Sequence, residues 1–209
     1  MSHVVLLGDS VFDNAAYVAG ASNVIRQVRQ RLPCGSKATL EAVDGSTIED
    51  VPEQLRRLPA DATHLIVSAG GNDALGHIDF LGAPAGSTAE ALLGLSDIAA
   101  AFERKYHAML AEVLAHGLPA AICTIYYPRF PDPDLQKVAV AALAVFNDCI
   151  VRAAFAHALP LLDLRFVCKE DGDYAEPIEP SAQGGEKVAG AIAGMLEDGF
   201  DSERTEAFY

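Results

Sequence analysis

Residues 3–10 read HVVLLGDS, a short apolar run that ends in a Gly-Asp-Ser turn. A run of this length is typical of a strand that is buried on both faces of a parallel sheet, and it is far too short to span a bilayer. Similar short runs recur along the chain and alternate with longer segments of helical periodicity. This alternation predicts an α/β fold in which helices cover both faces of a parallel sheet.

Five strands are expected, at residues 3–7, 38–43, 64–69, 120–125 and 161–164. The Gly- and Pro-rich segments at 76–88 and 127–134 have no periodicity, so we expect loops there. A single domain is predicted over residues 1–200, because a chain of 209 residues with 51% hydrophobic content suffices for one sizeable core. Residues 201–209 are polar enough to form a loose tail.

Three longer helices follow from apolar spacings of three and four. The first lies between the third and fourth strands and ends near Gly117, and its apolar stripe comprises Leu92, Leu95, Ile98, Phe102, Tyr106, Met109 and Val113. The second is expected at 134–158, with Val138, Ala142, Val145, Cys149 and Ala153 along one side. The last begins after Ser181 and turns Val188, Ile192 and Met195 toward the core.

The charge balance restricts the partners of the protein. There are 29 acidic and 15 basic residues, a formal net charge of −14, and such a surface repels nucleic acids and anionic membranes. The four cysteines have no CxxC spacing, which argues against a zinc site or a disulfide framework. The amino terminus lacks the charged and apolar regions of a signal peptide, so we expect a cytoplasmic location.

Polar residues follow the first three predicted strands. These clusters are Gly8-Asp9-Ser10, Asp44-Gly45-Ser46 and Gly70-Gly71-Asn72-Asp73. The carboxyl ends of parallel strands meet at one edge of the sheet, where ligands gather. Acyl transfer needs a hydroxyl nucleophile and donors aimed at the oxyanion, which Ser10, the amides of Ser10 and Gly45, and the side chain of Asn72 could supply.

With these three clusters in order, the chain resembles the SGNH, or GDSL, hydrolase family. The first family block matches at Gly8-Asp9-Ser10, the second at Gly45 and the third at Gly71-Asn72-Asp73. The resemblance implies a flavodoxin-like three-layer α/β/α fold, with Ser10 as the nucleophile and Gly45 and Asn72 as oxyanion donors. The family contains esterases, lipases, thioesterases and deacetylases.

The fourth block departs from the family pattern. In the family an Asp-x-x-His pair precedes the last helix, whereas residues 176–181 of this chain read EPIEPS. Alignment on the following Pro-Ser places Glu179 at the histidine position and Glu176 at the aspartate position. No histidine occurs after His157, so no shift of the alignment restores the expected base.

Two substitutes for the missing base are open. An ordinary glutamate has a pKa of about 4.3 against about 6.5 for histidine, and the nearby helix N-terminus favours the charged form, so Glu179 is expected to be a weak base. A proton shared between Glu176 and Glu179 would raise one pKa. The alternative base is His77, which lies in a loop after the third strand.

Two functions therefore compete. The first is a serine hydrolase that acts on a small acyl ester or acylated sugar, slowed by the missing histidine. The second is a ligand-binding protein on a degenerate hydrolase scaffold. A nucleotide-binding function is weaker, because no phosphate-binding glycine motif follows the first strand, and we expect neither a cofactor nor a metal.

Overall fold

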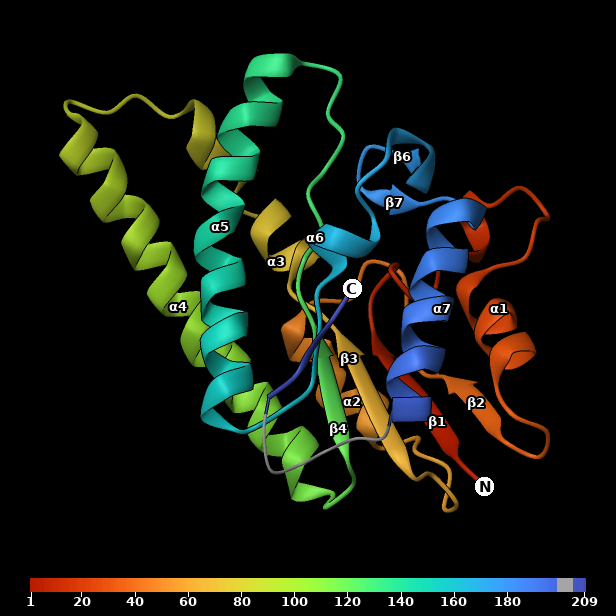
Figure 1. Ribbon diagram of the computed structural model, residues 1–209. Coiled ribbons are helices and arrows are strands. Elements are labelled where there is room, and N and C mark those ends of the chain that lie inside the picture. The colour runs from red at the N-terminus through yellow and green to blue at the C-terminus, as the bar shows by residue number, and fades with distance from the viewer. Residues whose placement is uncertain (199–204) are drawn as a thin grey trace.

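A parallel sheet forms the centre of the computed structural model, which describes residues 1–198 and 205–209 (Figure 1). The strand order is β2-β1-β3-β4-β5-β8, and every neighbouring pair is parallel. The strands are β1 (His3–Gly8), β2 (Lys37–Leu40), β3 (His64–Ser68), β4 (Ala120–Cys123), β5 (Leu161–Leu162) and β8 (Ala207–Phe208). The predicted α/β class and parallel sheet are confirmed.

Helices cover both faces of the sheet, as Figure 1 shows. One layer contains α2 (Val51–Leu55), α4 (Thr88–Ala115) and α5 (Pro133–Ala156), and the other contains α1 (Val24–Arg31), α6 (Leu164–Val167) and α7 (Ala182–Asp198). Alternate residues of β1 enter the two cores: Val5 and Leu7 face the α4–α5 layer, and Val4 and Leu6 face the α1–α7 layer.

Short elements occupy the loops around the carboxyl edge of the sheet. They are α3 (Gly71–Leu75), the 3₁₀ turns η1 (Ala15–Tyr17), η2 (Ile48–Asp50), η3 (Ile78–Gly82) and η4 (Asp171–Asp173), and an antiparallel hairpin of β6 (Tyr174–Glu176) and β7 (Glu179–Pro180). The hairpin directly precedes α7, so the fourth sequence block lies on a distinct element at this edge.

The sheet has six strands rather than the five expected. The additional strand, β8, lies in the segment that was predicted to be a loose tail, and that prediction is wrong for residues 207–208. The amide of Leu161 donates to Glu206 O at 2.8 Å, and the amide of Asp163 donates to Phe208 O at 2.8 Å. Backbone hydrogen bonds of this kind need no apolar pattern, so the composition gave no signal for β8. Residues 201–204 of the predicted tail lie outside the described residues.

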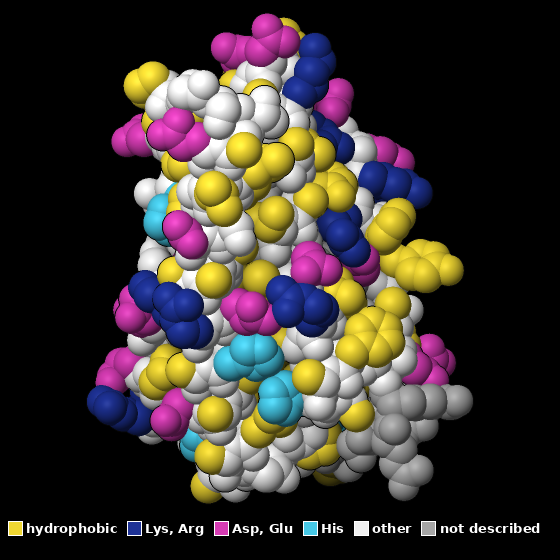
Figure 2. Space-filling model, turned by 90° about the vertical axis from the view of Figure 1, so that its left-hand side faces the viewer, with side chains coloured by type: hydrophobic (Ala, Val, Ile, Leu, Met, Phe, Trp, Pro, Cys, Tyr) yellow, Lys and Arg dark blue, Asp and Glu magenta, His cyan; other side chains and the backbone are white. Residues whose placement is uncertain are grey.

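The buried faces of the two long helices differ partly from the prediction. Leu92 is 60% exposed and Val138 is 46% exposed, although both belong to the apolar sides that the periodicity predicts. The first turns of α4 extend past the sheet, and α5 is apolar nearly all round, so periodicity could not select its inner face. Figure 2 shows the side of the molecule that α4 and α5 cover, and hydrophobic side chains gather over its upper half.

Other helix predictions are confirmed. Gly117 follows the end of α4 with a positive φ of 65° and donates its amide to Leu114 O at 3.0 Å. In α7, Val188, Ile192 and Met195 are buried as expected. Among the described helices, only α5 is long and apolar enough to cross a membrane, and 44% of that apolar stretch is buried within the molecule.

Candidate active site

A pocket opens at the carboxyl edge of the sheet, where β1, β3 and β4 end. Its empty space is about 950 Å³, including the open mouth. Both polar and apolar residues line it. The polar ones are Asp9, Ser10, Ser68, Asn72, His77 and Glu179. The apolar lining, which we call the apolar end, comes mainly from η3, α4, α5 and the loop after β4.

Ser10 enters this pocket from a sharp turn that follows β1. Gly8 makes the turn possible: its φ is 124°, and a Cβ there would lie 1.7 Å from the carbonyl oxygen of Ser68. The side chain of Gln54 holds the backbone of Gly8 from both sides, with Oε1 accepting its amide at 2.7 Å and Nε2 donating to its carbonyl at 2.8 Å. The residues before the predicted nucleophile are therefore fixed, and Ser10 itself is only 6% exposed.

Asn72 reaches the same pocket from the first turn of α3. Its Nδ2 donates to the carbonyl oxygen of Ser46 at 2.8 Å, which ties the third sequence block to the second. Because a side-chain amide carries two hydrogens, one N–H of Asn72 is still available to a ligand. Ser10 and Asn72 are thus brought together as the sequence predicted.

Gly45 is not among the residues that line the pocket. It is exposed, with a φ of 79°, and a Cβ at this position would have no heavy atom within 4 Å. Its neighbour Ser46 is buried and accepts the hydrogen bond from Asn72. The role of Gly45 as an oxyanion donor remains a prediction.

Glu179 reaches the pocket from β7 and is only 7% exposed. Burial raises the pKa of its carboxyl above the ordinary value of 4.5, although a hydrogen-bonding interaction with the Ser10 side chain lowers it; the charges of Asp44 and Glu176 raise it further. Among the described residues, its buried Oε2 has no hydrogen-bond partner. The pKa of Glu179 is therefore shifted upward, opposite to the direction that the sequence suggested, and burial is the main cause.

Glu176 lies elsewhere. It is exposed on β6, opposite Glu179 in the hairpin register, and it does not line the pocket. Its charge is the smallest of the influences that raise the pKa of Glu179. The hypothesis of a proton shared by the two glutamates is thus not needed, since burial is the main cause.

The sequence reasoning missed a second carboxyl in the pocket, that of Asp9. Its side chain is 4% exposed, and its Oδ1 accepts the amide of Val11 at 3.1 Å. Burial raises its pKa to about 7; the amide of Val11 lowers it, and the charges of Glu179 and Asp73 raise it further. The available signal was its position between a strand and a serine, which puts it at the edge where ligands bind.

His77 lines the pocket from the turn between α3 and η3, and its side chain is exposed. The other histidines of the chain lie away from this pocket, as expected. His3, for example, bonds to Asp61 and Thr39 at the opposite edge of the sheet. Among the residues that the structure describes, His77 is thus the only histidine that lines the same pocket as Ser10.

The geometry can be compared with known proteins. A family model described as the GDSL-like lipase/acylhydrolase family matches residues 6–187, a span that contains both Ser10 and Glu179. The chain belongs to this GDSL-like family. No curated protein matches it significantly.

Solved structures share the GDSL-like fold over almost their whole length. A lipase from a goat rumen metagenome has a TM-score of 0.71 at 17% identity, covering 93% of this chain and 98% of the lipase. An extracellular lipase from Streptomyces rimosus has a TM-score of 0.64 at 18% identity, covering 95% and 99%. A lipase/acylhydrolase from Enterococcus faecalis also has a TM-score of 0.64 at 18% identity, covering 97% and 98%. At these identities the likeness concerns the fold.

The pocket of this GDSL-like protein combines a hydroxyl, two carboxyls of raised pKa and a free amide N–H at one end. Such a set can take a proton from a nucleophile, return it to a leaving group and stabilise an oxyanion. The apolar end can bury the hydrocarbon part of a ligand.

Proposed function

We propose that the protein is a serine ester hydrolase in which Glu179 takes the place of the histidine base. The observation that supports this most directly is the joint presence of Ser10 and Glu179 in one pocket, with Glu179 buried and its pKa raised by that burial. A carboxylate of raised pKa is a better acceptor for a serine proton than an ordinary glutamate.

In the first half of the reaction, the Oγ of Ser10 attacks the acyl carbonyl and its proton passes to the ionised carboxylate of Glu179. A C–O bond forms, and the carbonyl electrons move to an oxyanion held by the Ser10 amide and the free N–H of Asn72. When the intermediate collapses, the bond to the leaving group breaks and Glu179 returns the proton to the alcohol or thiol. Water then repeats the sequence on the acyl-enzyme and releases the acid.

The proposed substrate is a small molecule with an acyl ester and an apolar part. The apolar end of the pocket supports this choice, because it offers aliphatic and aromatic side chains within one cavity with Ser10. These include Leu75, Phe80, Leu95, Ile98, Leu143 and Phe146. The binding energy of the apolar part can orient the carbonyl at Ser10.

The proposal is tested with p-nitrophenyl esters and variants of Glu179. We expect Glu179→Gln to lower kcat by about 10²–10⁴-fold with little change in KM, because the amide cannot accept the proton. Glu179→His should retain or raise activity, since it restores a base of higher ordinary pKa. The control is Ser10→Ala, which removes the proposed nucleophile. Hydrolysis that survives in this variant would contradict the proposal.

The pH dependence has a defined sign. Glu179 accepts a proton only when ionised, so kcat should rise as pH increases through its pKa, which lies above 4.5. Glu179→Gln should lose this acid limb. A rate in wild type that falls across the same pH range would instead indicate a protonated group as the essential one.

A second candidate is a binding protein that retains the pocket without turnover. The raised pKa of Glu179 favours it in one respect, because a protonated carboxyl can donate a hydrogen bond to a bound carbonyl or carboxylate. Thermal shift with acylated sugars and short fatty acids separates the two candidates. Ligand binding that is equal in wild type and Ser10→Ala, with no ester hydrolysis by wild type, would favour the binding protein.

A further inference from the structure

Among the described residues, the carboxyl of Glu179 interacts with Ser10 but has no second hydrogen-bond partner that would fix its orientation. Its buried Oε2 has no hydrogen-bond partner among the described residues, and Glu176 on the neighbouring strand is exposed. A base must nevertheless be held in reach of the proton that it accepts, and a displacement of about 1 Å can cost about 10²-fold in rate. Another part of the molecule must therefore position it.

The backbone around Glu179 is held instead. The amide of Arg129 donates to Pro177 O at 2.7 Å, and the hydroxyl of Tyr126 donates to Ile178 O at 2.6 Å. On the other side of Glu179, the Nδ2 of Asn14 donates to Pro180 O at 3.2 Å. We call these three hydrogen bonds the carbonyl clamp. The donors lie in the loop after β4 and in the segment after β1, and they bind backbone carbonyls on both sides of Glu179.

Two donors of the carbonyl clamp are themselves fixed. Tyr126 is buried, and its ring packs edge-on against Tyr174 with centroids 5.3 Å apart. Asn14 is fully buried, and its Oδ1 accepts the amide of Val24 at 2.9 Å at the start of α1. The clamp thus connects the hairpin to the segment after β1 that also carries Ser10.

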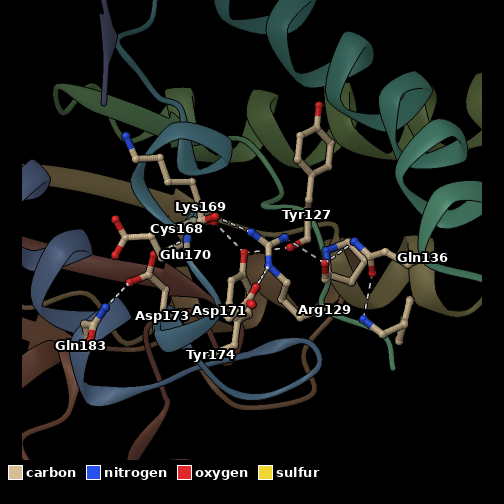
Figure 3. Close-up of polar contacts among 12 residues, drawn as sticks. Tyr127, Arg129, Gln136, Cys168, Lys169, Glu170, Asp171, Asp173, Tyr174 and Gln183 are labelled. Atoms are coloured by element: carbon tan, nitrogen blue, oxygen red, sulfur yellow. Dashed lines mark hydrogen bonds and ion pairs between the residues drawn. The ribbon is translucent and has the colours of Figure 1, made fainter. Parts of the chain in front are cut away.

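The third donor lies in a loop held by the contacts in Figure 3. The guanidinium of Arg129 donates to Lys169 O at 2.6 Å and to Asp171 Oδ1 at 3.1 Å, and it lies 4.9 Å from the ring centroid of Tyr174. Gln136 in turn holds the carbonyl of Pro128 at 2.7 Å. These contacts join the loop after β4 to the segment that leads into the hairpin.

We propose that Tyr126 and Asn14 are positioning residues, which direct Glu179 toward Ser10 by holding its backbone. They would thus orient the base, as an acidic side chain hydrogen-bonded to the base would otherwise do. This inference rests on the proposed function. Neither the Tyr126 hydroxyl nor the Asn14 side-chain amide needs to touch the reacting atoms, because each donates its hydrogen bond to a backbone carbonyl beside Glu179.

Tyr126→Phe removes one clamp donor and keeps the ring. We expect kcat for ester hydrolysis to fall about tenfold with KM within twofold of wild type, because positioning of the base is realised in the transition state. Loosening also admits water to the carboxyl, so the pH midpoint of Glu179 should fall toward its ordinary value. That midpoint is measured by ¹³C NMR of labelled glutamate, assigned with Glu179→Gln, and needs no activity.

Tyr106→Phe is the matched control. Tyr106 is also a buried tyrosine, but its hydroxyl has no hydrogen-bond partner among the described residues and it does not line the pocket. Removal of the Tyr106 hydroxyl should change neither kcat nor the pH midpoint at which Glu179 titrates. Arg129→Gln, which breaks the side-chain contacts behind the third donor, should shift both quantities in the same direction as Tyr126→Phe.

An unchanged kcat and an unchanged Glu179 midpoint in folded Tyr126→Phe would overturn the inference, as would equal losses in Tyr106→Phe. If wild type shows no Ser10-dependent hydrolysis, the proposed function fails separately. The midpoint comparison between wild type and Tyr126→Phe then still decides whether the carbonyl clamp holds Glu179.

Discussion

Two carboxyl groups, Asp9 and Glu179, reach one pocket from the turn after β1 and from the β6–β7 hairpin, and burial raises the pKa of both. At the level of residues, the sequence located Ser10, Asn72 and Glu179, because each follows a short apolar run or matches a block of fixed spacing. It could not give the direction in which the pKa of Glu179 shifts, since burial depends on side chains that are distant in the chain. The same reason explains why Asp9 was overlooked.

The raised pKa of Asp9 predicts a pH-dependent stability. Asp9 titrates at about 7 in the folded protein against 3.8 ordinarily, so between these values the folded state binds more protons and its contribution to stability falls as pH rises. Asp9→Asn cannot ionise but keeps an oxygen for the Val11 amide. We expect Asp9→Asn to match wild type in free energy of unfolding at pH 4 and to exceed it at pH 8.

The free energy of unfolding of wild type should fall by about 1.4 kcal/mol for each pH unit over which Asp9 is protonated in the folded state only. Urea unfolding at several pH values measures it. Asp97→Asn, an exposed change on α4, is the control and should leave the pH dependence of wild type intact. Parallel pH profiles for wild type and Asp9→Asn would contradict the environment assigned to Asp9.

At the level of elements, η4, which leads directly into the hairpin, packs on the first turn of α7. A Cβ at Gly184 would lie 2.1 Å from the carbonyl oxygen of Asp173, so this glycine is needed for the close approach. The sequence predicted the start of α7 correctly but gave no hairpin, because β6 and β7 together contain only five residues and have no apolar alternation. Their conformation depends on contacts with α7 and the loop after β4.

Two glycines of α7 give a matched pair of variants. We expect Gly184→Ala to lower the free energy of unfolding by about 1–3 kcal/mol, because backbone must move to admit the methyl group. Gly194→Ala should be neutral or stabilise by about 0.5–1 kcal/mol, since no heavy atom lies within 4 Å of the added Cβ and alanine favours a helix. Urea unfolding compares them, and equal effects at both positions would refute the close packing.

At the scale of the whole molecule, the pocket lies between the carboxyl edge of the sheet and the α4–α5 layer. The order of strands and helices, which the sequence predicted, determines where the polar end lies. The apolar end depends on how far α4 and α5 extend past the sheet, and sequence periodicity did not contain that information, as exposed Leu92 and Val138 show. The family fixes the scaffold, while this layer shapes the cavity.

Filling the apolar end should change the preference for acyl length. Ala142 lines the pocket from α5, so Ala142→Phe should lower kcat/KM for a p-nitrophenyl octanoate about tenfold relative to the acetate, because the ring occupies space for the longer chain. Ala141→Phe, at the exposed neighbouring position, is the control and should leave the ratio unchanged. An unchanged ratio in Ala142→Phe would place the acyl group elsewhere.

The central claim, that Glu179 activates Ser10, is tested most directly by the rate at which a fluorophosphonate modifies Ser10 in wild type and in Glu179→Gln. The adduct is located by mass spectrometry, and the rate is followed as a function of pH. We predict an adduct on Ser10 in wild type, a rate that rises with pH through a midpoint above 4.5, and a loss of about 10²-fold or more in Glu179→Gln. Equal rates in the two proteins, or no adduct on Ser10, would contradict it.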